Sequence, residues 1–117
     1  MSNTSQAFPR TLRSSVLNAS RHFPVVVVTG ARQVGKTTLL RDISDSDRQY
    51  ISLDDPFLLK LAKEDPELFL QNHPAPLLID EIQYAPELLP FIKMRVDGTK
   101  EKGMYWLTGS QPFHLMQ

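Results

Sequence analysis

One short stretch of the chain has the residue types and spacing of a phosphate-binding loop. Gly30 and Gly35 enclose four variable positions, and Lys36 and Thr37 follow directly. Glycines let backbone N–H groups approach an anion closely, and a helix that follows presents its positive N-terminal end to the same anion. In such a loop Lys36 reaches the β- and γ-phosphates of a nucleotide, and the Thr37 hydroxyl ligates Mg²⁺. The residues predicted to line this nucleotide site are Gly30, Ala31, Arg32, Gln33, Val34, Gly35, Lys36, Thr37 and Thr38.

Two adjacent carboxylates close a short apolar run in the second half of the chain. Residues 77–79 are Leu-Leu-Ile, and Asp80 and Glu81 follow them. Beside a phosphate-binding loop, the first acid is expected to hold Mg²⁺, and the second to activate the water that attacks the γ-phosphate. Asp54 and Asp55 are competing acids, which we interpret as a turn and a helix cap. Asp54 is also placed to approach the metal from a neighbouring strand.

A polar cluster follows the last apolar run. Ser110 and Gln111 come after residues 104–108 and Gly109. Ligands of open parallel sheets bind beyond the carboxyl ends of the strands, so either side chain is placed to hydrogen-bond the γ-phosphate or the attacking water. The alternative is an ordinary glycine turn that leads into a tail. The predicted catalytic residues are Lys36, Glu81, Ser110 and Gln111, and the predicted metal ligands are Thr37 and Asp80.

The elements that must position these residues alternate between strand and helix. Four consecutive valines at residues 25–28, followed by Thr29, predict a strand that is buried on both faces, as in a parallel sheet covered by helices. Pro66 divides a long helical stretch, so we expect two helices there, capped by Asp55 and Asp65. Strands separated by helices indicate βαβ units. Further strands are expected at residues 50–53, 77–79 and 104–108, and helices at residues 11–21, 36–43, 56–70 and 86–96.

The composition limits the classes of protein to consider. The 117 residues suit one domain, with residues 1–10 as a flexible tail and residues 11–117 as the folded part. Lys+Arg and Asp+Glu are each 13, so the formal net charge is zero and a strongly basic surface for nucleic acid is not expected. The lack of cysteine excludes disulfides and thiolate metal sites. Because the sequence has neither a membrane-spanning apolar run nor a signal peptide pattern, we expect a soluble cytoplasmic protein.

Taken together, these motifs resemble those of a known family. The similar segments are TGARQVGKTTL at residues 29–39, LDDP at 53–56, LIDEIQ at 78–83, APELL at 85–89 and LTGSQ at 107–111. They look like the AAA-type ATP-binding proteins of bacteria and archaea, which pair an N-terminal ATPase domain with a C-terminal domain of unknown function. The resemblance implies a three-layer α/β fold of the P-loop NTPase class, with a parallel sheet in the order 1-4-3-2. It also implies that Lys36 and Thr37 belong to Walker A, Asp80 and Glu81 to Walker B, and Ser110 or Gln111 to sensor 1.

The chain also departs from that family's pattern. It stops directly after the sensor region, whereas such proteins continue with a fifth strand, an arginine that completes a neighbour's active site, a helical lid and the second domain. We therefore expect an N-terminal fragment with an incomplete AAA core, in which the first strand lies at the edge of the sheet. The expected partners are a nucleotide and either another copy of the chain or the C-terminal domain.

The function that these patterns favour is binding of Mg-ATP with hydrolysis of the β–γ bond. Hydrolysis by this chain alone is expected to be slow, because no arginine follows Arg95 in the sequence. One alternative is a non-catalytic nucleotide-binding module that switches a partner's contacts. Another is a P-loop kinase of small molecules, against which Glu81 argues because a water-activating acid favours hydrolysis. Adenine is favoured over guanine, because the guanine-binding pattern Asn-Lys-x-Asp does not occur in the sequence.

Overall fold

A sheet of four parallel strands forms the middle of the fold. The computed structural model describes residues 3–30 and 36–110, with side chains for residues 11–30 and 37–110. Within that part the strand order is β1-β4-β3-β2, which confirms the α/β class and the order 1-4-3-2. Every neighbouring pair runs in the same direction. The strands are β1 (Val25–Gly30), β2 (Gln49–Ser52), β3 (Leu77–Asp80) and β4 (Tyr105–Ser110).

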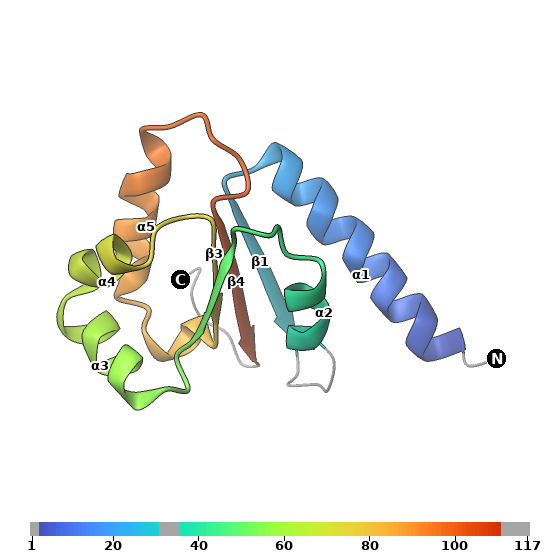
Figure 1. Cartoon of the computed structure of the whole chain (residues 1–117), viewed down its shortest axis with the longest axis horizontal. Helices are drawn as coiled ribbons and strands as arrows, with labels where there is room; N and C mark the ends of the chain where they lie inside the picture. Colours follow the sequence, from blue (N-terminus) through green and yellow to red (C-terminus); the bar gives the residue numbers. More distant parts are fainter. Residues whose placement is uncertain (1–2, 31–35, 111–117) are drawn as a thin grey trace.

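Helices cover both faces of the sheet, which gives the fold three layers (Figure 1). One face carries α1 (Asn3–His22) and α2 (Lys36–Asp42). The opposite face carries α3 (Pro56–Glu64), α4 (Pro66–Asn72) and α5 (Leu88–Asp97). In the part of the chain described, no helix is both long enough and apolar enough to cross a membrane.

The two faces of the sheet bury separate hydrophobic cores. Side chains alternate between the faces along a strand, so Leu78 and Trp106 pack toward α1 and α2. Ile79 and Leu107, one position further along, pack toward α3, α4 and α5. β3 is buried along its whole length, as expected for an apolar run in the middle of a parallel sheet.

β1 does not have the burial predicted from its four valines. Val26 and Val28 are buried beneath α1 and α2, whereas Val27 is 46% exposed on the other face. The core on that face is built from β2, β3 and β4, and of β1 only Val25 packs against it. The prediction of burial on both faces is therefore wrong. β1 does lie at the edge of the described sheet, as expected.

The first helix is longer than predicted. It begins at Asn3 and ends at His22, instead of spanning residues 11–21, so the helix includes residues 3–10 of the segment predicted as a tail. Val16 on this helix is buried against the sheet, and Leu12 and Leu17 pack against the same core, which fixes the second half of α1 on the sheet. A polar composition does not itself end a helix, since apolar packing at one end supports the turns that precede it.

The helices around Pro66 form as predicted. The Asp55 carboxylate accepts hydrogen bonds from the backbone N–H of Phe57 and Leu58 at the start of α3. Asp65 does the same for Leu68 at the start of α4. One element was not predicted: a single 3-10 turn (Ile82–Tyr84) follows β3, and α5 begins at Leu88, two residues later than expected.

Candidate functional site

Polar side chains from several elements meet at the carboxyl ends of the strands. Because the strands are parallel, their carboxyl ends share one edge of the sheet, which is the lower edge in Figure 1. β3 ends at Asp80 and β4 at Ser110. α2 begins at this edge, so Thr37 in its first turn lies beside β3. Residues that are far apart in the sequence are thus brought to one place.

Asp80 is the centre of this arrangement. It is only 7% exposed, and three hydroxyl groups donate hydrogen bonds to its carboxylate. Thr37 Oγ1 donates to Oδ1 over 3.2 Å, and Tyr50 Oη donates to Oδ2 over 3.2 Å. Thr108 Oγ1 also donates to Oδ1. Hydrogen bonds to the ionised form of a buried carboxylate offset the cost of burying its charge.

Thr108 connects Asp80 to the residue that follows it. The backbone N–H of Glu81 donates to Thr108 Oγ1 over 3.2 Å, while the same hydroxyl donates to Asp80. Because its acceptor capacity serves Glu81, the hydroxyl proton is directed at Asp80. Thr108 is 1% exposed, so this junction between β3 and β4 is closed to solvent.

Glu81 adopts a left-handed backbone conformation, with φ 63° and ψ 48°. In an extended strand, consecutive side chains point to opposite faces. The left-handed residue ends β3 and turns the chain, so the Glu81 carboxylate stays near that of Asp80. A residue other than glycine pays roughly 1–2 kcal/mol for this conformation. Strain of this kind is often found at functional sites.

In the described part of the chain, two neutral side chains donate to the Glu81 carboxylate. Gln83 Nε2 donates to Oε1 over 2.7 Å, and Ser110 Oγ donates to the same oxygen over 3.3 Å. Glu81 is 6% exposed. Ser110, which was predicted as one of two sensor residues, thus contacts the predicted base directly.

Three carboxylates gather at this edge of the sheet. One oxygen from each of Asp54, Asp80 and Glu81 lies within 4.8 Å of the others, so the group has the spacing needed to hold a cation. Oxygen donors of this kind suit Mg²⁺. Asp54 is exposed and its neighbour Asp55 is the α3 cap, so the interpretation of these two acids holds for Asp55. For Asp54, the structure favours the alternative over a simple turn residue, because one of its carboxylate oxygens lies within 4.8 Å of those of Asp80 and Glu81.

Tyr50 was not singled out in the sequence, yet it contacts Asp80. Its ring lies under the guanidinium of Arg41 from α2, at 4.3 Å from the ring centre. Burial raises the pKa of the Tyr50 phenol above its ordinary value, and the negative charge of Asp80 raises it further. The hydroxyl therefore stays protonated near neutral pH and acts as a donor. No local pattern marks Tyr50, because its role depends on the pairing of β2 with β3.

Other predicted site residues are described only in part. Residues 31–35 and Gln111 lie outside the described residues, and so does the side chain of Lys36, whose backbone opens α2. Thr38 is exposed on α2. Gly30 ends β1 with φ 147°, a conformation that favours glycine, and among the described residues none has an atom within 4 Å of the position a Cβ would take.

A family model described as "AAA domain" matches residues 22–117. The chain belongs to the AAA domain family. The match includes the whole sheet and the helices α2 to α5, whereas α1 precedes it except for His22. AAA domains are P-loop NTPase-like, in agreement with the parallel sheet and its order.

Two curated mycobacterial proteins are similar in sequence to this AAA domain. They are an uncharacterized protein of Mycobacterium bovis and an uncharacterized protein of Mycobacterium tuberculosis. Each is 36% identical to the chain over 89 residues, which is 74% of this chain and 20% of the relative. The chain thus spans about a fifth of the length of the curated relatives that it matches. No solved structure matches it significantly.

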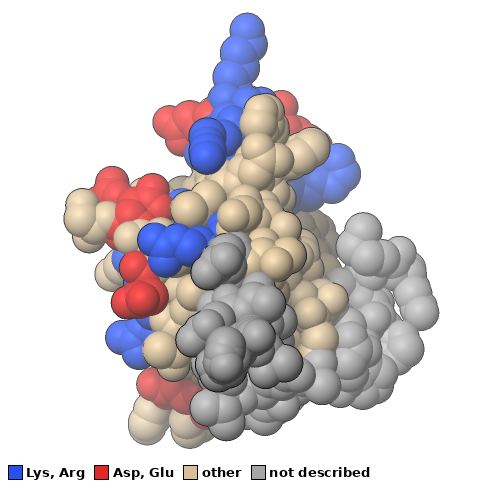
Figure 2. Space-filling view, turned by 90° about the vertical axis from the view of Figure 1, so that its right-hand side faces the viewer, with Lys and Arg blue, Asp and Glu red and all other residues tan. Residues whose placement is uncertain are grey.

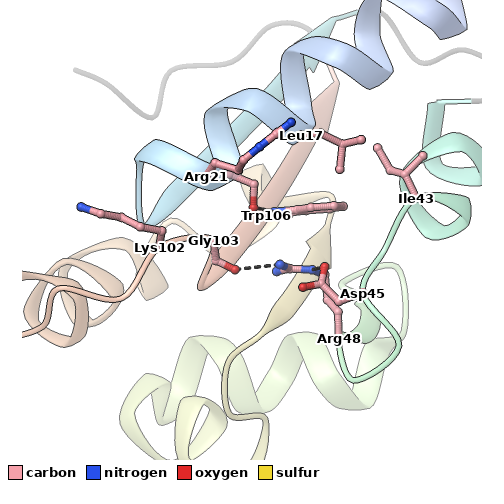
Figure 3. Close-up of a pocket in the computed structure, with 9 residues that line it drawn as sticks. Leu17, Arg21, Ile43, Asp45, Arg48, Lys102, Gly103 and Trp106 are labelled. Carbon is pink, nitrogen blue, oxygen red and sulfur yellow. Dashed lines mark hydrogen bonds and ion pairs between the residues drawn. The ribbon is translucent and has the colours of Figure 1, made fainter.

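The AAA domain also has a cavity of about 490 Å³ at the amino ends of its strands (Figure 3). Arg48 lies inside it, with its guanidinium over the Trp106 ring at 4.0 Å from the ring centre. Its Nη2 donates to the carbonyl oxygen of Gly103 over 2.7 Å, and its Nε pairs with Asp45 over 3.2 Å. Burial lowers the pKa of Arg48 and the charge of Asp45 raises it. The cavity is lined by Leu17, Ser20, Arg21, Ile43, Asp45, Arg48, Lys102, Gly103 and Trp106.

The surface on the α1 side of the domain, which faces the viewer in Figure 2, carries charges of both signs. Figure 2 shows Lys and Arg side chains toward its upper end, with Asp and Glu side chains beside them and farther down. Arg21 and Lys102, at the rim of the cavity, are exposed. The described charges of this face are therefore interspersed, in line with the zero net charge of the sequence.

Proposed function

We propose that this AAA domain binds ATP together with Mg²⁺ at the carboxyl edge of its sheet. The observation that supports this most is the hydrogen bond from Thr37 to Asp80, over 3.2 Å. It joins the helix that follows the loop sequence to the acid that ends β3, although the two residues are 43 positions apart. A hydroxyl and a carboxylate at this distance are two oxygen ligands of the kind that Mg²⁺ prefers.

The loop of residues 30–35 and Lys36 would bind the phosphates. The sequence supplies two glycines for close approach of the backbone and one lysine for the β- and γ-phosphates. Thr37 and Asp80 would hold Mg²⁺, with Asp54 near enough to take part. The bound cation would offset the repulsion between the clustered carboxylates and the phosphates.

We further propose that the domain hydrolyses the β–γ bond. Glu81 would take a proton from a water molecule whose oxygen attacks the γ-phosphorus, as the bond to the bridging oxygen breaks. Gln83 and Ser110 both donate to Glu81 Oε1, which supports a fixed orientation of this carboxylate beside Asp80. Ser110 is the better supported sensor residue, because it contacts Glu81, and Gln111 stays the alternative.

Binding is tested by titrating the chain with fluorescent ATP and GTP, with Mg²⁺ and with EDTA. Lys36→Ala should weaken ATP binding 10-fold or more, which corresponds to roughly 1.5–3 kcal/mol for a lost charge-assisted contact. The matched control is Lys93→Ala, because Lys93 is exposed on α5 and pairs with Asp97. It should leave the affinity unchanged.

Phosphate release measured on the same samples separates binding from hydrolysis. Release that depends on Mg²⁺ and on Glu81 supports an ATPase, whereas tight binding without release supports the nucleotide-binding module. Equal ATP affinity of the chain and of a folded Lys36→Ala variant would contradict the assignment of the loop.

A further inference from the structure

Tyr50 reaches the Asp80 carboxylate diagonally across two paired strands. The register pairs Tyr50 with Leu78 and Ser52 with Asp80. Tyr50 and Leu78 belong to the same core, on the face covered by α1 and α2. Asp80, two residues after Leu78, points to that face as well. Diagonal neighbours of this kind are within reach of an aromatic side chain, and Tyr50 Oη donates to Asp80 Oδ2 over 3.2 Å.

The hydrogen bonds divide the two oxygens of Asp80 between different partners. Thr37 and Thr108 both donate to Oδ1, and Tyr50 donates to Oδ2. The last side-chain torsion of an aspartate is otherwise broadly distributed. With donors on both oxygens, rotation of the carboxylate would break at least one hydrogen bond. Among these three donors, Tyr50 alone restrains Oδ2.

The Tyr50 ring is itself fixed by the helix that bears the loop residues. The Arg41 guanidinium lies over the ring at 4.3 Å from its centre, and Arg41 is in the last turn of α2. The first turn of α2 carries Lys36 and Thr37. The tyrosine thus contacts both α2 and β3, the two elements that would hold the phosphates and the cation.

We propose that Tyr50 is a positioning residue, whose hydroxyl aligns the Asp80 carboxylate so that it can hold the divalent cation. This inference rests on the function proposed above. Partners that orient a metal ligand through a hydrogen bond typically account for 10–100-fold in metal affinity. Tyr50 orients the ligand from outside the cation site and would not contact the nucleotide.

The test is Tyr50→Phe, which keeps the ring and its contact with Arg41 and removes only the hydroxyl. The affinity for fluorescent ATP is measured as a function of free Mg²⁺. The half-saturating Mg²⁺ concentration should rise on the order of 10-fold. The affinity for ATP in EDTA should stay within twofold, because the phosphate contacts are unaltered.

The matched control is Tyr105→Phe. Tyr105 is 1% exposed and belongs to the core on the other face of the sheet. This variant removes a tyrosine hydroxyl from a strand of the same sheet without touching Asp80, and its Mg²⁺ dependence should equal that of the unaltered chain. Thermal unfolding of all three chains establishes that they are folded at the temperature of the titration.

A second titration, with Mn²⁺ alone followed by electron paramagnetic resonance, separates this inference from the proposed function. Tyr50→Phe should bind Mn²⁺ more weakly than the unaltered chain does, on the order of 10-fold. If the chain binds Mn²⁺ but not ATP, the proposed function fails and the Mn²⁺ difference still decides the role of Tyr50. Equal cation affinities in Tyr50→Phe and the unaltered chain, or equal losses in Tyr50→Phe and Tyr105→Phe, would overturn the inference. A chain that binds neither ATP nor Mn²⁺ would overturn both proposals.

Discussion

The two ends of the sheet differ in the partners of their charged side chains. At the amino end, Arg48 has partners for its charge and its N–H groups, namely the Asp45 carboxylate and the carbonyl oxygen of Gly103. At the carboxyl end, carboxylate oxygens of Asp54, Asp80 and Glu81 lie within 4.8 Å of one another. The side chains described as donating to Asp80 and Glu81 are neutral hydroxyls and an amide.

The difference separates a stabilising polar cluster from one that is prepared for a ligand. Removing one member of a buried, hydrogen-bonded charge pair destabilises a fold, because the remaining partner is left buried without its counterpart. Like charges held close together are themselves unfavourable. Functional sites commonly sacrifice stability in this way. We therefore expect substitutions at the carboxyl end to change chemistry, and substitutions at the amino end to change the free energy of unfolding.

The largest effect expected is on hydrolysis at the carboxyl end. Glu81→Gln keeps an oxygen that can accept from Gln83 and Ser110 but removes the base, so hydrolysis should fall on the order of 10²-fold or more, equivalent to about 2.7 kcal/mol. ATP should remain bound. The control is Glu87→Gln, because Glu87 pairs with Lys63 at the exposed start of α5. Hydrolysis by Glu81→Gln at the unaltered rate would assign the base elsewhere, with Asp54 the next candidate.

A smaller effect is expected at the amino end, and on stability alone. Arg48→Met removes the donor to the Gly103 carbonyl and the cation over Trp106, which should lower the free energy of unfolding by about 2–3 kcal/mol. Urea denaturation measures this loss. The exposed Arg21 lines the same cavity, so Arg21→Met should change the free energy by less than about 0.5 kcal/mol.

A loss of ATP affinity in Arg48→Met molecules that are still folded would contradict the assignment of stability alone to the amino end of the sheet. Equal stability of Arg48→Met and Arg21→Met would likewise contradict a stabilising role for the buried guanidinium.

The smallest effect expected is at Gly103, whose carbonyl accepts from Arg48. Its φ is 65°, and a Cβ there would lie 2.5 Å from Ser20 Oγ and 3.0 Å from the Ser20 carbonyl oxygen. Gly103→Ala should therefore destabilise the chain by about 1–2 kcal/mol. Gly98→Ala is the matched control, because no atom lies within 4 Å of its Cβ position and its φ is −95°. If the two variants unfold at the same urea concentration, the close contact with α1 does not constrain the turn before β4.

The parts of the site that could be predicted are those encoded by neighbouring residues. Thr37 follows a glycine-rich pattern, and Asp80 and Glu81 follow an apolar run, so each position is visible in a few consecutive letters. Capping by Asp55 and Asp65 is local in the same way. The strand order came from the resemblance to a family, because periodicity alone predicts strands without their neighbours.

The parts that could not be predicted depend on how distant segments pair. Tyr50 and Thr108 reach Asp80 only because β2 and β4 both lie beside β3. The exposure of Val27 depends on which helices extend over β1, and valine has the same β propensity in an exposed strand as in a buried one. No residue pattern in the sequence predicts the left-handed conformation of Glu81 either, since glutamate rarely adopts it.

The position of β1 also has a consequence for synthesis on the ribosome. Its strand partner in the described sheet is β4, and the register pairs Val25 with Tyr105. At roughly 5–20 residues per second, the valine segment leaves the ribosome on the order of ten seconds before the strand that it must join. An uncharged run of β-branched residues without a partner is prone to pair with other nascent chains. We therefore expect the yield of folded protein to depend on how soon β4 follows β1 out of the exit tunnel.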